Sequence, residues 1–430
     1  MTQTSPEAAQ PLQDIHERVA AYFEAHAPAA FDPANPKVRL HEPTFGADEI
    51  NAVLDTMLTT WVTMGKRVIE FEKAYGRAFG FAHGVMNNSG SSANLLAAAA
   101  LTSPGAEDGL KAGDEVIVSA LSWSTTVWPL VQHGLVPVIV DIDPATLNID
   151  PAEIERAIGP KTRAVMPVHV YGNPCDMTAI GGICERHGLT LIEDCCEALG
   201  AEYGGKPVGR FGRIGTFSFY FSHHMTTVEG GICVTDDGGL ADVMRILRSH
   251  GWTRDTEDPA RFNDRHPDID PRFLFVDLGY NLRPTEMQAA MGSVQLPKLA
   301  SFVAARRESA RFFTDALAAY DPVLAVQRET DGGSHSWFGF PVTVRDGAPF
   351  GVAELRRHLE AAGIETRPII CGNIAKQPGL QSQPHRTQGD LRHASHVMDH
   401  AISFGCHQSV DAPARRYVAE QFAAFMKPYV

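Results

Sequence analysis

The residues best suited to chemistry lie in one short run, residues 218–231, where His223 and His224 stand side by side. A neutral imidazole accepts and returns a proton near neutral pH, but unlike a lysine amine it makes no stable imine with an aldehyde. Histidine in this run could transfer a proton but could not capture a carbonyl compound covalently. A histidine outside such a context is ordinarily structural, and we interpret His224 in that way.

Two other runs suggest binding chemistry. Residues 89–93 combine a glycine with serines immediately before an apolar helical stretch at 94–101, and a helix N-terminus of this kind offers N–H and O–H donors to a phosphate. Taken alone, the same pattern fits an ordinary serine N-cap. Asp194 follows the apolar run 189–193 and should emerge at the carboxyl end of a strand, where ligands of α/β sheets bind. A helix N-cap is its alternative role.

Short apolar runs alternate with helical segments through the first two thirds of the chain. Runs of this kind, joined by helices, are typical of buried parallel strands. They predict an α/β fold with a large, doubly wound and mostly parallel sheet. The runs are residues 84–86, 115–118, 136–140, 164–168 and 189–192.

The remaining segments divide the chain into domains. The start combines an amphipathic helical pattern with an Ala/Pro linker at 27–36, and a long helical stretch at about 284–318 precedes mixed strands and helices. The sequence thus predicts a smaller C-terminal α+β domain. We expect an N-terminal extension at 1–36, a large domain at 37–283, a connecting helix at 284–320 and a small domain at 321–430.

Composition excludes several functional classes. The 430 residues are 44% hydrophobic and carry a formal net charge of −14, which argues against nonspecific binding to nucleic acid or anionic membranes. No apolar run approaches the roughly 20 residues that span a bilayer, and the start has no signal-peptide pattern. The seven cysteines form no CxxC pair. We therefore expect a cytoplasmic protein with reduced thiols, no metal, no membrane partner and no nucleic-acid partner.

These motifs occur together and in the order seen in one family. From about Val38 to the C-terminus the chain resembles the pyridoxal-phosphate-dependent DegT/StrS-type sugar aminotransferases. In that family a lysine at the position of His223 anchors the cofactor. The paired histidines followed by Met225, Thr226 and Thr227 resemble the nucleotide-sugar 3-dehydratase branch. The resemblance implies the fold-type-I aminotransferase architecture and a homodimer with shared active sites.

The resemblance also implies a set of cofactor-binding residues. Pyridoxal 5'-phosphate, alternating with pyridoxamine 5'-phosphate, would be held noncovalently, with L-glutamate as co-substrate and His223 as catalytic base. Trp123 would lie against the cofactor ring, Asp194 would meet the pyridine nitrogen and Glu197 the ring hydroxyl. The ordinary structural alternatives are a tryptophan buried in the core for Trp123 and a glutamate in the first turn of a helix for Glu197. The phosphate would be bound by Gly90, Ser91, Ser92 and Ser218, and by Asn281 from the partner subunit.

The expected substrate is a nucleotide-linked 4-keto-6-deoxy sugar that loses its C3 hydroxyl, giving a 3,6-dideoxy-4-keto sugar. Substrate contacts are implied for His250, Arg254, Arg367 and Asn373, and an arginine fork is well suited to a diphosphate. Some related 3-dehydratases carry an iron–sulfur cluster on a cysteine-rich insert after the histidine run. Residues 250–273 contain no cysteine, so we expect no cluster here.

Two other functions stay open on sequence alone. A nucleotide-sugar aminotransferase would need another lysine, and Lys206 is the nearest, although its surroundings indicate an exposed turn. A catalytically silent homologue would bind cofactor or sugar nucleotide as a regulator. The retained Asp194, Glu197 and Ser218 argue against such decay. The nucleotide base and the sugar stereochemistry are not specified by these motifs.

Overall fold

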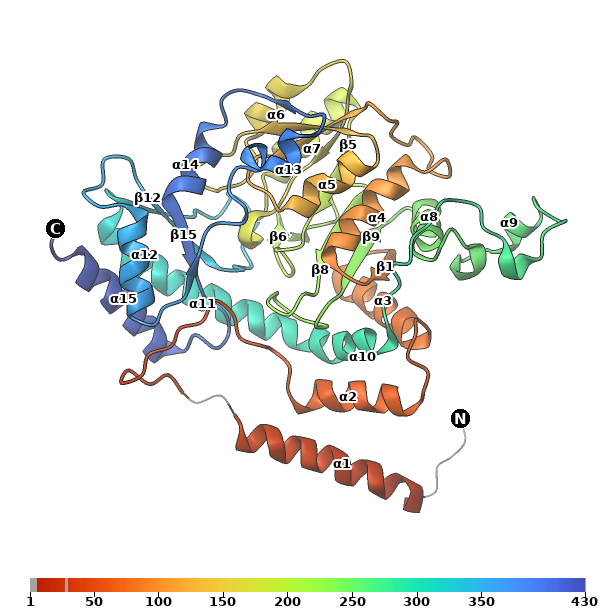
Figure 1. Cartoon of the computed structure of the whole chain (residues 1–430), viewed down its shortest axis with the longest axis horizontal. Helices are drawn as coiled ribbons and strands as arrows, with labels where there is room; N and C mark the ends of the chain where they lie inside the picture. Colours follow the sequence, from red (N-terminus) through yellow and green to blue (C-terminus); the bar gives the residue numbers. More distant parts are fainter. Residues whose placement is uncertain (1–5, 28–29, 430) are drawn as a thin grey trace.

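A mixed, mostly parallel sheet forms the centre of the computed structural model, which describes residues 6–27 and 30–429 (Figure 1). Its strand order is β1-β9-β8-β5-β4-β2-β3-β14. All neighbouring pairs from β8 to β14 are parallel, whereas β9 runs antiparallel to both β1 and β8. The strands are β1 His83–Asn87, β2 Glu115–Ser119, β3 Val136–Val140, β4 Thr162–Met166, β5 Thr190–Asp194, β8 Ile214–Ser218, β9 Gly231–Thr235 and β14 Arg386–Thr387.

The predicted α/β fold is confirmed, and each of the five apolar runs overlaps one of the strands β1 to β5. Strands β8 and β9, which flank the histidine run, were not among the predicted strands. Both are buried along their whole length even though each contains glycine and a hydroxyl residue, because β8 lies between β5 and β9. The histidine run is thus a loop between two central strands.

Helices cover both faces of this sheet. On one face α4 is apolar nearly all round because it is enclosed by the sheet, α5 and α8. The other face packs against α6 and α7, and α3 and α10 extend that layer. The bounds are α3 Lys66–Phe79, α4 Gly90–Thr102, α5 Ser124–Gln132, α6 Pro151–Ala157, α7 Met177–His187, α8 Gly238–Arg248 and α10 Glu286–Gln295.

A second sheet of order β10-β12-β15-β13 packs against its own helices beside the large sheet. The predicted connecting helix is interrupted by a 3-10 turn at Leu296–Lys298, where Pro297 cannot continue the α-helical hydrogen bonding. The bounds are α11 Leu299–Leu317, β10 Leu324–Val326, β12 Phe340–Val344, α12 Val352–Ala361, β13 Thr366–Arg367, α14 Arg392–His400, β15 Ala401–Phe404 and α15 Ala412–Met426.

The chain crosses between these two layers more than once. Strand β14, from the C-terminal part of the chain, joins the large sheet beside β3, and Val38 pairs with Ile364 near the small sheet. The domain boundaries at 36, 283 and 320 stay our proposal. Minor elements are a three-stranded sheet, β6 Glu202–Tyr203, β7 Lys206–Pro207 and β11 Gly333–Ser334, and the short helices α9 Ala260–Asn263 and α13 Pro378–Gln381.

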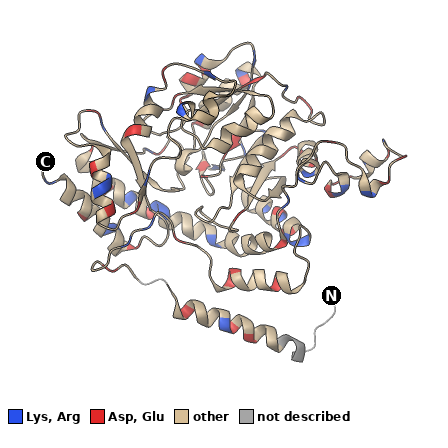
Figure 2. Cartoon of the chain, viewed as in Figure 1, with Lys and Arg blue, Asp and Glu red and all other residues tan. Residues whose placement is uncertain are grey.

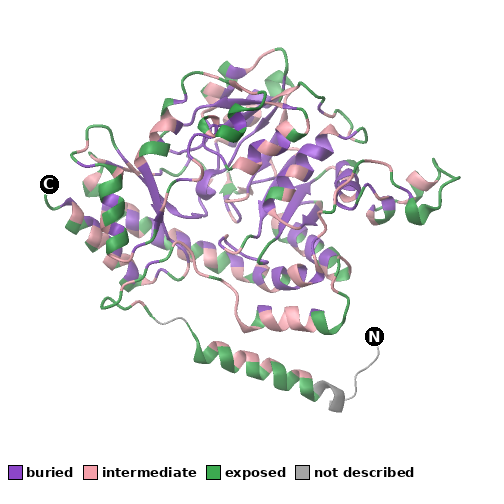
Figure 3. Cartoon of the chain, viewed as in Figure 1, coloured by how far each residue is buried: buried purple, intermediate pink, exposed green. Residues whose placement is uncertain are grey.

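The N-terminal helix lies apart from the main body. Helix α1, Pro6–Ala25, runs along α2, Ala47–Leu58, and His16 bonds to Asp55 at 2.7 Å (Figure 1). Part of the predicted linker, residues 28–29, lies outside the described residues. Lys and Arg are interspersed with Asp and Glu (Figure 2), and burial is concentrated at the two sheets (Figure 3). Among the described helices, none combines the length and the apolar character needed to cross a membrane.

Candidate active site

The carboxyl end of β5, the N-terminus of α4 and the loop after β8 meet around a hollow of about 460 Å³. This is the edge where the strand pattern predicted a ligand site. The structure brings most of the predicted residues to this hollow, although they come from both sheets. Its wall includes Gly90, Ser91, Trp123, Asp194, Glu197, Ser218, His223 and Arg367.

The first turn of α4 forms one end of the hollow. Ser89 caps the helix by accepting the N–H of Ser92 at 3.0 Å, so Ser92 supports the turn without lining the hollow. The backbone amides of Gly90 and Ser91, unlike that of Ser92, have no acceptor within the helix. Gly90 is required here because a Cβ would lie 2.4 Å from the Cβ of Ser218. Hydroxyls and free amides thus converge in a cradle suited to a phosphate.

Asp194 is held by a clamp of donors that sequence reasoning missed. One carboxylate oxygen accepts from Asn94 Nδ2 at 2.8 Å and from Thr126 Oγ1 at 2.7 Å, and the other accepts from the Cys196 N–H at 3.1 Å. The residue is 3% exposed. One signal was present in the sequence, since Asn94 is the one polar residue in the apolar stretch 93–101 of α4. These bonds fix the carboxylate in an orientation toward the hollow.

Glu197 lies near Arg367, which belongs to strand β13 of the second sheet. Its carboxylate accepts the Tyr171 N–H at 2.9 Å, and burial raises the pKa of Glu197 to about 7 although the charge of Arg367 opposes the rise. Tyr171 has a φ of 58°, an uncommon conformation for a non-glycine residue, and its hydroxyl bonds to Ser403 Oγ at 2.7 Å. The first-turn interpretation of Glu197 is therefore incomplete, because its side chain faces the hollow.

The Glu197 pKa leads to a stability prediction for the ligand-free protein. The folded state holds the proton that the unfolded chain releases near pH 4.5, so stability falls as pH rises from about 4.5 to 7. Because some solvent reaches this side chain, we expect a loss of only about 1–3 kcal/mol. Glu197→Gln should remove that loss, so the variant gains stability relative to the wild type at pH 8 but not at pH 4.5. Urea denaturation at both pH values measures the free energy of unfolding of the two proteins.

The control for this prediction is Glu202→Gln, since Glu202 is exposed. An equal gain in stability in that variant at pH 8 would contradict the prediction.

His223 lines the same hollow as Asp194. Its ring lies 5.0 Å from the ring of Phe338, and its buried Nδ1 has no hydrogen-bond partner among the described residues. Burial, followed by the charges of Arg367 and Arg306, lowers the pKa of His223 to about 3. The imidazole is therefore neutral at every working pH. Such a ring can accept a proton from a ligand in the hollow.

Two hydrogen bonds hold the loop that carries His223 in place. Thr226 N–H donates to Gln295 on α10 at 3.2 Å, and the fully buried His224 shares a hydrogen bond with the Ser336 carbonyl at 3.0 Å. Because a carbonyl only accepts, Nε2 of His224 carries the proton. This contact agrees with the structural role expected for His224. The neighbouring histidine alone reaches the hollow.

No lysine lies among the described residues that line the hollow. Lys206 belongs to β7, outside the hollow, and its Nζ lies 4.5 Å above the ring of Phe211. Trp123 is 55% exposed and lines the hollow, so it is not a core tryptophan. Its indole face is free to cover a flat ring.

Four predicted residues lie elsewhere. His250 and Asn281 are exposed and lie together at the bridge between Ser249 and Asn281, and neither lines the hollow. Arg254 stacks 4.0 Å from the ring of Trp252. The Asn373 amide is already used, since it accepts the Ala375 N–H and donates to Ser395, each at 3.0 Å. Their substrate and phosphate roles stay predictions.

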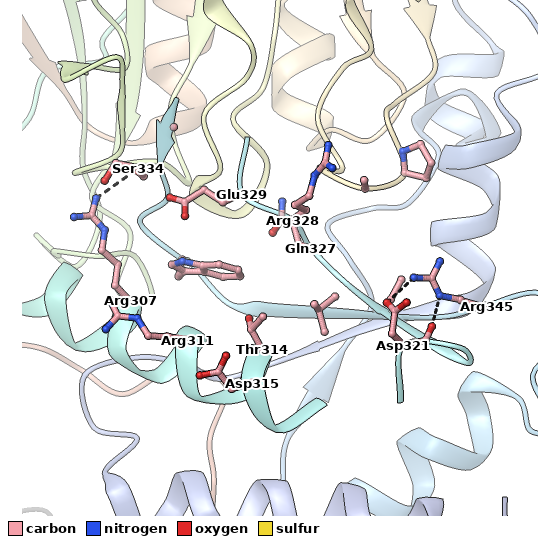
Figure 4. A pocket seen from close by; sticks show the side chains of 16 residues that line it. Arg307, Arg311, Thr314, Asp315, Asp321, Gln327, Arg328, Glu329, Ser334 and Arg345 are labelled. Atoms are coloured by element: carbon pink, nitrogen blue, oxygen red, sulfur yellow. Dashed lines mark hydrogen bonds and ion pairs between the residues drawn. The ribbon is translucent and has the colours of Figure 1, made fainter. Parts of the chain in front are cut away.

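A second hollow of about 860 Å³ lies between α11 and the β10 side of the small sheet (Figure 4). Although arginines line it, Arg345 is paired with Asp321 at 2.9 Å and Arg307 donates to the Ser334 carbonyl at 3.3 Å. These guanidinium groups hold neighbouring segments together. None of the predicted site residues lines this hollow.

The first hollow fits a flat, phosphorylated pyridine. The cradle at α4 suits the phosphate, Trp123 suits the ring face, Asp194 suits the protonated ring nitrogen and Glu197 suits a ring hydroxyl. A Cβ at Gly90 would fill the cradle. The fold and the site define the class: a pyridoxal-phosphate-dependent protein of the aminotransferase fold with histidine at the lysine position.

The chain belongs to the DegT/DnrJ/EryC1/StrS aminotransferase family, whose profile matches residues 43–423. It is 42% identical over 373 residues to the GDP-4-keto-6-deoxy-D-mannose 3-dehydratase of Yersinia pseudotuberculosis, an alignment that covers 86% of this chain and 94% of the relative. The predicted family is thereby confirmed.

Solved structures give the same result. The chain resembles the E. coli GDP-4-keto-6-deoxy-D-mannose-3-dehydratase with bound hydrated PLP, with a TM-score of 0.83, 36% identity, and coverage of 91% of this chain and 100% of that one. A structure of GDP-4-keto-6-deoxymannose-3-dehydratase with a trapped PLP–glutamate geminal diamine also has a TM-score of 0.83 and 36% identity, covering 90% of this chain and 100% of that one.

Proposed function

We propose that this protein uses pyridoxal 5'-phosphate and L-glutamate to remove the C3 hydroxyl of a nucleotide-linked 4-keto-6-deoxy sugar. The product is a 3,6-dideoxy-4-keto sugar, and GDP-4-keto-6-deoxy-D-mannose is the first substrate to test. The observation that carries the proposal is the neutral, unpartnered imidazole of His223 in a cofactor-shaped hollow without lysine. The names of the similar dehydratases support the same reaction and co-substrate.

Each residue of the hollow has a separate role in the proposed reaction. When bound, pyridoxal phosphate supplies a carbonyl carbon that takes an amino group from glutamate and a ring that withdraws electrons. Asp194 would keep the ring nitrogen protonated, and Trp123 would cover one face of the ring and hold it in position. Neutral His223 accepts a proton from the carbon beside the ring. Its imidazolium would then give that proton to the departing C3 hydroxyl, which would leave as water. Over the whole reaction glutamate would be oxidised to 2-oxoglutarate, its amino group would leave as ammonia, and the sugar would lose one oxygen atom.

Ligand charge tunes the base. The low His223 pKa follows from burial beside Arg367 and Arg306. A cofactor phosphate and a sugar diphosphate bring negative charge into the same hollow and offset these guanidinium groups. The His223 pKa then rises toward the range in which an imidazole is an effective base. Arg367 also has the geometry to bind a ligand phosphate or hydroxyl.

The alternative enzyme is an aminotransferase. It needs a lysine at the cofactor, and none lines the hollow in the described part of the chain, with Lys206 held on β7. A silent homologue would not need the three-donor clamp on Asp194. Dehydration explains both the missing lysine and the retained clamp.

The mass of the product tests this function. We expect purified protein incubated with pyridoxal phosphate, L-glutamate and GDP-4-keto-6-deoxy-D-mannose to release a sugar nucleotide lighter by one oxygen atom. The dTDP-linked sugar is the matched control for the nucleotide base. A product in which an amine has replaced the ketone oxygen means transamination and contradicts the proposal. Unchanged substrate with both nucleotides contradicts the substrate assignment.

We also propose a homodimer in which His250, Arg254 and Asn281 reach the partner's hollow. All three are exposed, and none lines the hollow of its own chain. Sedimentation equilibrium measures the assembly, and a monomer would contradict it. A cytoplasmic location is part of the proposal, supported by free thiols at all seven cysteines, which suit a reducing compartment.

A further inference from the structure

A cluster between α14 and the turn after β12 has the features of a metal site. His396 and His400 are four residues apart on α14 and present their rings to the same side, with ring centres 4.4 Å apart. Asp346 approaches them from the turn after β12. The candidate ligand atoms of the three side chains lie within 4.8 Å of one another.

The proton on His396 is placed by a backbone contact. Its Nε2 lies 3.2 Å from the Val344 carbonyl, which can only accept, so this nitrogen carries the hydrogen. In the neutral ring Nδ1 is then a lone pair, and it faces Asp346 Oδ1. A backbone carbonyl that orients the second ring nitrogen is the usual support of a metal-bound histidine. Two acceptors that face each other at an exposed site are bridged by a water molecule, a proton or a metal ion.

The separation favours a metal ion over a bridging proton. His396 Nδ1 lies 3.4 Å from Asp346 Oδ1, well beyond the ~2.7–2.9 Å of a charge-assisted hydrogen bond. A tetrahedral zinc ion with ligands at about 2.0–2.2 Å places its ligand atoms roughly 3.3–3.5 Å apart. The observed pair already has that spacing. The third candidate ligand, His400, lies one turn further along α14, and the candidate ligand atoms of all three side chains fall within 4.8 Å of one another.

The backbone around the cluster is also held in place. The turn carrying Asp346 is closed by the hydrogen bond from the Ala348 N–H to the Arg345 carbonyl, and Gly347 supplies its φ of 81°. The start of α14 is anchored by Asp141, which accepts the N–H of Ala394 at 2.9 Å. The backbones of both elements are thus held in place, while the Asp346 side chain itself is 91% exposed.

We propose that Asp346, His396 and His400 bind a divalent ion of the zinc type, with water at the fourth position. Two imidazoles and a carboxylate suit Zn²⁺ better than Mg²⁺, which prefers oxygen ligands. The ion would join α14 to the turn after β12. This site is independent of the dehydratase reaction.

The test uses the full chain without an affinity tag, freed of metal by a chelator and loaded with cofactor. We expect calorimetry to detect one zinc equivalent per chain that Mg²⁺ does not replace, and zinc to raise the melting temperature by about 1–4 °C. Asp346→Asn and His400→Ala should each weaken zinc binding at least tenfold. His393→Ala, on the same helix but outside the cluster, is the matched control.

Cobalt(II) gives a second readout, because a tetrahedral site produces visible absorption bands that these variants should remove. Melting curves without metal show whether each variant is folded. The proposal is overturned if zinc does not bind, or if Asp346→Asn and His400→Ala bind it as well as the wild type does. In either case the cluster is only an ion pair beside stacked rings.

Discussion

Replacing His223 with asparagine should lower the rate of C3 deoxygenation by about 10²–10⁴-fold, the usual contribution of a positioned base. Asparagine has similar bulk but no titratable nitrogen. The phosphate cradle and the Asp194 clamp do not involve His223, so cofactor affinity should change little. Product formation followed by mass, together with cofactor titration by absorbance, separates the two quantities.

The matched control is His266→Asn, an exposed histidine far along the chain from this loop. It should leave the rate unchanged. His223→Lys provides the complementary observation, since a lysine at this place should attach the cofactor covalently and shift its absorbance. Full activity in the asparagine variant would remove His223 from the reaction.

Asp194→Asn should reduce both turnover and cofactor affinity. The substitution keeps the size of the side chain but removes the charge that pairs with the protonated ring nitrogen. Breaking a buried charge pair costs about 3 kcal/mol or more. That loss corresponds to about 10²-fold or more in rate. The clamp adds to the effect, because asparagine has one oxygen where Asp194 has two, so its NH₂ group must face either the Cys196 N–H or the shared donors Asn94 and Thr126.

The experiment compares the rate at saturating cofactor with the dissociation constant for pyridoxal phosphate. Asp268→Asn is the control, since this carboxylate is exposed. Thr126→Val removes one clamp donor and should give a smaller loss than Asp194→Asn. If the two variants lose equal activity, the charge of Asp194 is not what the ring requires.

Local sequence patterns alone predicted several strands and several candidate site residues of this protein. Apolar runs of five or so residues specify strands, and the residue after a run falls at the ligand edge of the sheet, so Asp194 could be placed without a structure. The Gly-Ser run before an apolar helix identified the cradle at α4 in the same way. His223 was predicted from the resemblance of residues 218–231 to the cofactor loop of a known family, and its catalytic role stays a prediction.

Only the tertiary structure decided which side chains complete the site. Asn94 and Asp194 are 100 positions apart, and Arg367 comes from the second sheet to face Glu197. The raised Glu197 pKa and the lowered His223 pKa follow from burial and from these distant charges. Sequence periodicity describes contacts within a helix or strand. Contacts between elements depend on how the sheets pack, so the clamp and the charges of the site emerge only on folding.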